Sequence, residues 1–212
     1  MEVVALKIGI IGAGNIGANL GLLWAKRGHD IRFGVRNPEA EKELAARAGG
    51  RTAAVDVRSA AAFGEVVVLA VPWEAVPSVL DQAGDLSGKV LIDCTNPIRW
   101  ENGPVVAIEG SGAEEVAKRA PGAKVVKAFN TLGAEHLQAP RFGGYKADVY
   151  IATDDQAARN VAASLARELG FDVVDAGPLR NARLLEHLGV LWVHLATQGG
   201  LWRSIAFKVL RK

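Results

Sequence analysis

Two hydrophobic patterns alternate along this chain, short apolar runs that predict strands and apolar positions at helical spacing that predict helices. The first run, Lys7–Ile11, is rich in β-branched side chains, as in a buried parallel strand. After a glycine-rich stretch, Ile16, Leu20 and Trp24 fall on one face of a helix. The pattern therefore predicts a strand, a turn and a helix from Lys7 onward, with Gly28 as the C-cap of the helix.

The same alternation continues to the end of the chain and predicts the fold class. Further strands are expected at Asp30–Val35, Thr52–Val55, Val66–Val71, Lys89–Asp93, Lys124–Ala128, Val149–Ala152 and Asp172–Asp175. Because helical patterns separate these strands, we expect an α/β protein with a doubly wound parallel sheet of the Rossmann type. A long helical segment is expected over Arg180–Lys212, thinned at Gly199-Gly200.

The turn between the first strand and helix carries three glycines at a spacing that suits a dinucleotide. In the stretch Gly12-Ala13-Gly14-Asn15-Ile16-Gly17, the first glycine permits a tight turn and the second lets backbone approach a pyrophosphate. Gly17 lets the helix pack close to the sheet. Since the N-terminus of a helix offers free N–H groups and partial positive charge, we expect Gly12 to Ile16 to bind the pyrophosphate.

The end of the second strand indicates which dinucleotide is bound. An acidic residue at this place binds the ribose 2′-hydroxyl of NAD, whereas an arginine accommodates the 2′-phosphate of NADP. No carboxylate occurs between Asp30 and Glu39, and the strand ends in Arg36-Asn37. The guanidinium of Arg36 has the fork of donors that phosphate oxygens favour, so the sequence predicts NADP(H).

Three later strands also end in small polar or aromatic residues at the edge where ligands bind. These ends are Val71-Pro72-Trp73, the turn containing Asn96, and Asn130-Thr131. Because parallel strands present their carboxyl ends at one edge, we expect these residues to form the floor of a nicotinamide site. Trp73 is expected either to form a wall of this site or to anchor the helix that follows.

Composition excludes several other classes of protein. Of the 212 residues, 50% are hydrophobic and the formal net charge is +2, which argues against a nucleic-acid binder. The single cysteine, Cys94, fits a reducing cytoplasm. We see neither a signal peptide nor an apolar run of roughly 20 residues, so we expect a cytoplasmic protein without stable membrane insertion.

The last twelve residues, Leu201–Lys212, form a helical pattern that is apolar on one side and basic on the other. This pattern resembles a membrane-surface helix, but a helix that packs on its own fold or on a second subunit is commoner. We therefore expect that a homodimer, if formed, uses this C-terminal helical segment.

No side chain pattern indicates a metal site or a catalytic dyad. Cys94 has no activating base beside it in the sequence, and His187 and His194 lack a third ligand in register. His136 follows a strand end closely enough to reach a substrate and is the one candidate for a proton donor. We assign neither a catalytic residue nor a metal ligand.

Several stretches together resemble one family. Besides the glycine turn, they are Gly34-Val35-Arg36-Asn37-Pro38, Val71-Pro72-Trp73, Lys127-Ala128-Phe129-Asn130-Thr131, Asp175-Ala176-Gly177-Pro178-Leu179 and Ala182-Arg183-Leu184-Leu185-Glu186. The chain is similar to the NADPH-dependent coenzyme F420 reductases, and also to the reductase domain of membrane ferric reductases. Val35 departs from the serine or threonine that is usual in the family, so the grip on the 2′-phosphate depends more on Arg36 and Asn37.

The resemblance implies how the chain is divided and where a second ring binds. Residues 1–132 would form the NADP-binding Rossmann domain, and residues 133–212 an extension that completes the sheet and closes the acceptor cleft. We expect Leu132 and Leu179 at the mouth of that cleft.

These observations lead to one principal functional hypothesis and two alternatives. The principal one is hydride transfer between NADPH and a small-molecule acceptor, a deazaflavin (coenzyme F420) or a flavin, which needs orientation of two rings more than an acid or base. The first alternative is an NADP-dependent reductase of a small carbonyl or imine, which would need a proton donor. The second is a binding protein that senses NADPH without turnover.

Overall fold

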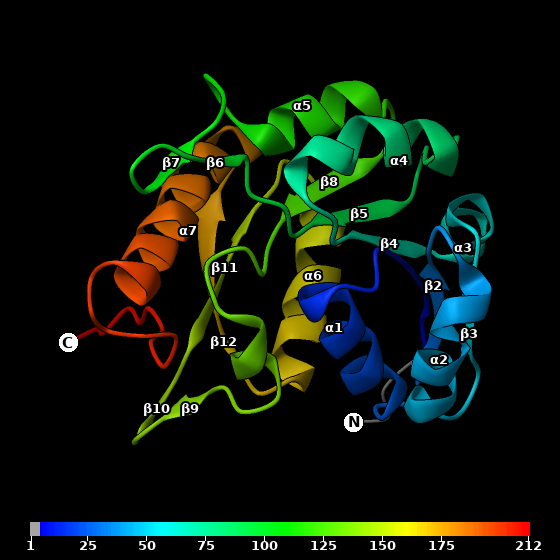
Figure 1. Cartoon of the computed structure of the whole chain (residues 1–212), viewed down its shortest axis with the longest axis horizontal. Coiled ribbons are helices and arrows are strands. Elements are labelled where there is room, and N and C mark those ends of the chain that lie inside the picture. The colour runs from blue at the N-terminus through cyan, green and yellow to red at the C-terminus, as the bar shows by residue number, and fades with distance from the viewer. Residues whose placement is uncertain (1–4) are drawn as a thin grey trace.

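A sheet of eight strands forms the centre of the protein in the computed structural model, which describes residues 5–212 (Figure 1). In chain order its strands are β1 (Lys7–Ile11), β2 (Asp30–Gly34), β3 (Thr52–Val55), β4 (Val66–Leu69), β5 (Val90–Asp93), β8 (Lys124–Lys127), β11 (Asp148–Ala152) and β12 (Asp172–Gly177). Across the sheet the order is β12-β11-β8-β5-β4-β1-β2-β3. The chain reverses direction across the sheet between β1 and β4, and this is where doubly wound sheets bind ligands.

Helices cover both faces of the sheet, as the doubly wound fold requires. They are α1 (Asn15–Ala25), α2 (Lys42–Ala48), α3 (Val57–Phe63), α4 (Val76–Ala83), α5 (Gly112–Arg119), α6 (Gln156–Glu168) and α7 (Ala182–Thr197). Side chains of α1, α2 and α6 share one buried cluster with the sheet, which includes Leu20, Trp24 and Phe33. Side chains of α3, α4, α5 and α7 share a second cluster on the other face, which includes Leu80 and Leu185. The predicted fold class is thus confirmed.

Short elements connect this framework. Four 3₁₀ turns are present among the described residues, η1 (Pro38–Glu41), η2 (Trp73–Ala75), η3 (Ala134–Leu137) and η4 (Leu179–Asn181). Two small hairpins were not predicted, β6 (Ile98–Trp100) with β7 (Pro104–Val106), and β9 (Arg141–Phe142) with β10 (Tyr145–Lys146). The helical region between β2 and β3 is divided into η1 and α2.

The sheet is mostly parallel, with one antiparallel junction that the sequence did not reveal. Strands β3, β2, β1, β4, β5 and β8 are parallel neighbours. β11 joins β8 in the antiparallel sense through a single pair, Ala152 with Lys127. A parallel connection needs a crossover, usually a helix, but residues 128–147 between these strands form only η3 and a hairpin. β11 and β12 therefore run steeply across the direction of β4 and β5 in Figure 1.

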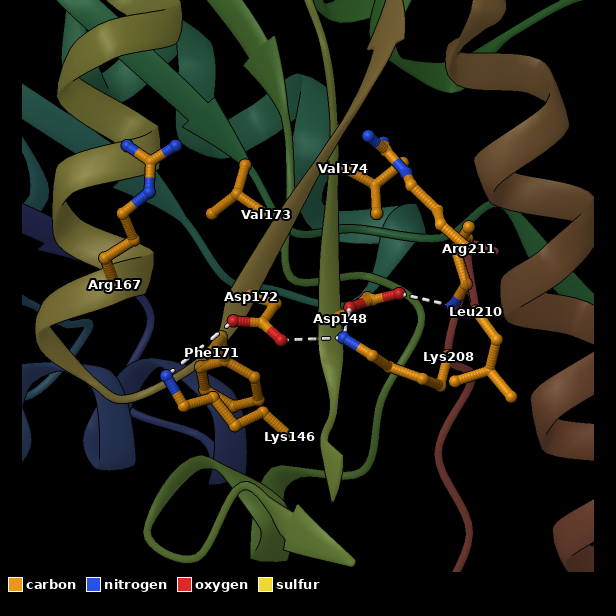
Figure 2. A pocket seen from close by; sticks show the side chains of 11 residues that line it. Lys146, Asp148, Arg167, Phe171, Asp172, Val173, Val174, Lys208, Leu210 and Arg211 are labelled. Carbon is orange, nitrogen blue, oxygen red and sulfur yellow. Dashed lines mark hydrogen bonds and ion pairs between the residues drawn. The ribbon is translucent and has the colours of Figure 1, made fainter. Parts of the chain in front are cut away.

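The expected helix over Leu201–Lys212 is wrong, because α7 ends at Thr197 and the last twelve residues are not helical. Their backbone bonds to other parts of the fold instead. The Trp192 indole donates to the carbonyl of Ile205 at 2.9 Å, and the amide of Asp148 donates to the carbonyl of Phe207 at 3.2 Å. Figure 2 shows Lys208 between Asp148 and Asp172. Its ammonium nitrogen lies 2.7 Å from a carboxylate oxygen of each. Tertiary contacts thus outweigh the helical pattern.

The homodimer through the C-terminal segment stays a prediction. Within the helical segment expected over Arg180–Lys212, the structure has the α-helix α7, which exposes Leu184 and Leu191 to solvent. Among residues 5–212, no helix combines the length and the apolar character needed to cross a bilayer.

A buried group of charges ties α7 to the sheet. The Lys127 ammonium at the end of β8 lies 2.9 Å from Asp93 of β5 and 3.2 Å from Glu186 of α7, and all three side chains are fully buried. Glu186 also accepts hydrogen bonds from the amides of Gly112 and Ala113 at the start of α5. Burial disfavours the charged ammonium, but the charges of Asp93 and Glu186 outweigh it, and the pKa of Lys127 lies above its ordinary value.

We predict that Lys127→Ala lowers the free energy of unfolding by about 3–5 kcal/mol, because it leaves two buried carboxylates without their cation. Lys118→Ala is the matched control, since Lys118 forms an exposed ion pair with Glu115 and its loss should change stability little. Urea denaturation followed by circular dichroism measures both variants. Similar losses for the two lysines would contradict a central role of the buried group.

Candidate functional site

A cavity of about 680 Å³ opens at the carboxyl ends of β1, β2 and β4, beside α4. This volume is within the range of small-molecule sites. Seven residues predicted from the sequence line it, Gly12, Ala13, Gly14, Arg36, Asn37, Val71 and Pro72. The structure thus brings the glycine turn, the end of β2 and the end of β4 to one cavity.

The three glycines of the turn differ in why the structure has a glycine at each position. Gly12 has φ +99°, and a Cβ at this position would clash with the carbonyl of Ala70. A Cβ at Gly17 would clash with the carbonyl of Gly12, so Gly17 allows α1 to approach the turn closely. Gly14 differs, because its φ is −70° and a Cβ there would meet no atom within 4 Å. Gly12 and Gly17 therefore serve the fold, whereas Gly14 leaves space open beside the cavity.

The N-terminus of α1 has the features of an anion site. Gly14 is its N-cap, no side chain caps the helix, and its first turn carries no acidic residue. Asn15 and Ile16 begin the helix, and Ile16 also packs against the hydrophobic cluster of that face. Because the first amides of a helix lack intrahelical acceptors, they remain available to a phosphate.

The opposite wall carries one basic side chain. Arg36 is exposed at the end of β2, and within residues 5–212 its guanidinium has neither an ion pair nor a hydrogen-bond partner. Asn37 caps η1, since its side chain oxygen accepts from the amide of Ala40 at 3.4 Å. Val35 lines the cavity and packs partly against the core. As a hydrocarbon side chain, it offers no hydroxyl to a ligand there. The cation available to an anion on this wall is therefore Arg36.

Sequence reasoning missed the part of the cavity formed by η1 and α4. Ala40 and Glu41 line it from η1, and Ser78 and Gln82 line it from α4. Gln82 donates to the carbonyl and hydroxyl oxygens of Ser78, each at 3.1 Å. The available signal was this polar pair one turn apart on the helix that follows β4.

Asn96 and Asn130 come together, but at a different place from the cavity. The amide nitrogen of Asn96 donates to the carbonyl of Asn130 at 2.7 Å, and that of Asn130 donates to the side chain oxygen of Asn96 at 2.9 Å. Asn130 also donates to the carbonyl of Leu185 on α7. Thr131 is buried next to this pair. These contacts hold the ends of β5 and β8 against α7, and a role in nicotinamide binding stays a prediction.

Trp73 lies in η2 and is half-buried. It packs with the cluster on the α4 and α5 face, where its ring approaches Gly112. It is not among the residues that line the cavity. These contacts give Trp73 a packing role beside α5, and a role as a wall of the nicotinamide site stays a prediction.

Leu132 and Leu179 do not form the mouth of a cleft. Both side chains are buried, with 7% and 8% of their surface exposed, and they belong to the clusters on opposite faces of the sheet. Because they pack on opposite faces, Leu132 and Leu179 do not meet at one opening, and the expectation is wrong.

The cysteine and histidines of interest have structural surroundings. Cys94 is buried, and burial raises the pKa of its thiol, so the reactive thiolate is disfavoured. His136 lies on η3, where its ring contacts the backbone carbonyl of Arg203 and the edge of Phe142. His136 does not line the cavity.

Comparison with known proteins identifies the class to which this fold and cavity belong. Residues 7–97 match the family model described as NADP oxidoreductase, coenzyme F420-dependent. Over these residues the chain is similar to this family. The matched residues contain the glycine turn, Arg36 and the part of α4 that lines the cavity.

The relatives differ in how much of their own length aligns with this chain. The structure of a protein from Arthrobacter sp. FB24, described as an F420-dependent NADP reductase, is 29% identical, with a TM-score of 0.88 over 98% of this chain and 100% of that one. The metalloreductase STEAP3 of Rattus norvegicus is 34% identical over 86% of this chain, which corresponds to 36% of that protein. The chain thus spans about a third of the curated metalloreductases. A reductive aminase from Aspergillus terreus, 18% identical with a TM-score of 0.67 over 93% of this chain and 63% of that one, shares the fold.

We predict that Gly14→Val abolishes dinucleotide binding and leaves the protein folded, because the added side chain enters the open space beside the cavity. Gly17→Val is the informative contrast, since it should disrupt the packing of α1 and lower stability. Titration calorimetry measures binding, and thermal denaturation measures stability. Unchanged nucleotide binding by a folded Gly14→Val variant would contradict the placement of the pyrophosphate.

Proposed function

We propose that the chain binds NADP(H) in the 680 Å³ cavity and transfers hydride between its nicotinamide and a deazaflavin or flavin-like acceptor. The observation that carries this proposal is the pairing of an uncapped helix N-terminus with an unpaired arginine across one cavity. The pyrophosphate would bind at Gly14 and the first amides of α1. The ribose 2′-phosphate would bind Arg36, whose guanidinium can donate two parallel hydrogen bonds.

The α4 side of the cavity would hold the adenosine end. Ser78 and Gln82 offer a hydroxyl and an amide, which can donate to or accept from ring nitrogens. Apolar side chains beside them, Val57, Ala75 and Val79, supply surface for a flat ring. From there the bound dinucleotide would extend along the edge of the sheet toward the ends of β5 and β8, where Asn96, Asn130 and Thr131 lie.

The chemistry proposed needs no acid or base among these residues. When bound, NADPH supplies the hydride at its nicotinamide ring. Direct transfer to a second ring depends on proximity and orientation, to which a rigid floor contributes. The Asn96 and Asn130 pair, fixed to α7 through Leu185, would provide such rigidity. The similarity to a protein described as an F420-dependent NADP reductase supports a deazaflavin as the acceptor.

The decisive experiment mixes the protein with NADPH under anaerobic conditions and offers coenzyme F420, FMN, FAD, riboflavin and ferric chelates in turn. Absorbance follows both NADPH and the acceptor. We expect stoichiometric reduction of a deazaflavin or flavin. Turnover of small carbonyls or imines alone would favour the other reductase hypothesis, and binding without any turnover would favour an NADPH sensor.

For the cofactor we predict that Arg36→Ala weakens NADPH by about one to two decades, while NADH changes little. The lost charge-assisted hydrogen bonds to the 2′-phosphate are worth about 1.5–3 kcal/mol. Arg47→Ala is a matched control, because Arg47 is also an exposed arginine, on the nearby α2, but does not line the cavity. Dissociation constants for both nucleotides measure the effect. An equal loss for NADPH and NADH would show that Arg36 does not contact the phosphate.

A further inference from the structure

The cavity contains one carboxylate that the proposed binding of NADP(H) leaves unexplained. Glu41 is the last residue of η1 and lines the cavity together with Arg36. It is half-buried, and within residues 5–212 its carboxylate has no ion pair and no hydrogen-bond partner. The neighbouring Glu39 differs, because it is exposed, pairs with Lys42 at 2.5 Å and does not line the cavity.

A carboxylate on this wall acts differently on the two dinucleotides. A phosphate monoester carries between one and a half and two negative charges at neutral pH, so Glu41 would repel the 2′-phosphate of NADPH. It would also compete with that phosphate for the guanidinium of Arg36, which has no other described partner. NADH presents a hydroxyl instead, and a hydroxyl can donate a hydrogen bond to a carboxylate.

The rest of this wall does not compensate for the repulsion. Val35 has no hydroxyl to offer the phosphate, and Asn37, whose side chain oxygen accepts from Ala40, can offer it only uncharged amide N–H donors. Arg36 is the one cation among the residues that line the cavity. Its single positive charge would therefore have to balance the ligand's phosphate in a cavity that Glu41 also lines.

We propose that Glu41 is a specificity-determining residue that limits the preference for NADPH, so that the protein also uses NADH. This inference rests on the proposed function, because it assumes that the cavity holds the adenosine ribose. It concerns selectivity at the ribose end and is independent of which acceptor receives the hydride.

The test compares Glu41→Gln with Glu39→Gln, two variants that remove the same charge from the same 3₁₀ turn. Dissociation constants for NADPH and NADH are measured for the wild type and both variants at low and high salt. We expect Glu41→Gln to raise the ratio of NADPH to NADH affinity by at least about threefold, and Glu39→Gln to leave the ratio unchanged. The effect of Glu41→Gln should shrink at high salt, because screening weakens charge repulsion.

A second variant, Glu41→Lys, keeps the test informative because it reverses the charge at the same place. It should raise the ratio beyond that of Glu41→Gln, mostly by tightening NADPH. If the wild type binds both nucleotides and the two Glu41 variants change the ratio no more than Glu39→Gln does, the role of Glu41 is refuted while the proposed function stands. If the wild type binds neither nucleotide, the proposed function fails and this inference fails with it.

Discussion

The buried contact of Lys127 with Asp93 and Glu186 holds α7 against the central sheet. Asp93 and Lys127 end neighbouring strands, and Glu186 comes from the last helix of the chain. Two carboxylates and one ammonium leave a net negative charge in the interior, which would be costly alone. The start of α5 offsets this charge, since Glu186 accepts from two of its free amides and from the hydroxyl of Ser111. Four elements are therefore fixed by one network in which each charged group has partners.

The cavity at the other strand ends is built on the opposite principle. There several polar groups have no partner within residues 5–212, namely the first amides of α1, the guanidinium of Arg36 and the carboxylate of Glu41. Unpaired groups cost little where water reaches them, and they are free to bind a charged ligand. The contrast separates residues whose polar groups bond within the fold from residues whose polar groups remain accessible at the cavity, although both kinds lie near carboxyl ends of strands of the same sheet.

The family relationship agrees with this division. Its matched region, residues 7–97, contains the glycine turn, Arg36 and α4, and ends at Pro97 just after the β5 end. The Arthrobacter structure extends the likeness to 98% of the chain, including α7. Residues 7–97 are thus supported by both kinds of comparison. The rest of the chain is supported by the structural comparison, and for that reason the acceptor is a proposal.

The sequence by itself determined the order of strands and helices, the glycine turn and the side chains at the ends of β2 and β4, because these depend on local periodicity and on residues adjacent in the chain. It could not determine features that depend on contacts between distant residues. One such feature is the antiparallel pairing of β11 with β8. Another is the conformation of Leu201–Lys212, which has a helical pattern but is not helical in the structure, where Trp192 and Asp148 donate hydrogen bonds to its backbone. In the same way, Asn96 and Asn130 are polar strand ends in the sequence, but only the packing of α7 made them a pair bonded to each other. Glu41 became part of the cavity because η1 lies at its wall, and the one-dimensional pattern carries no signal for that.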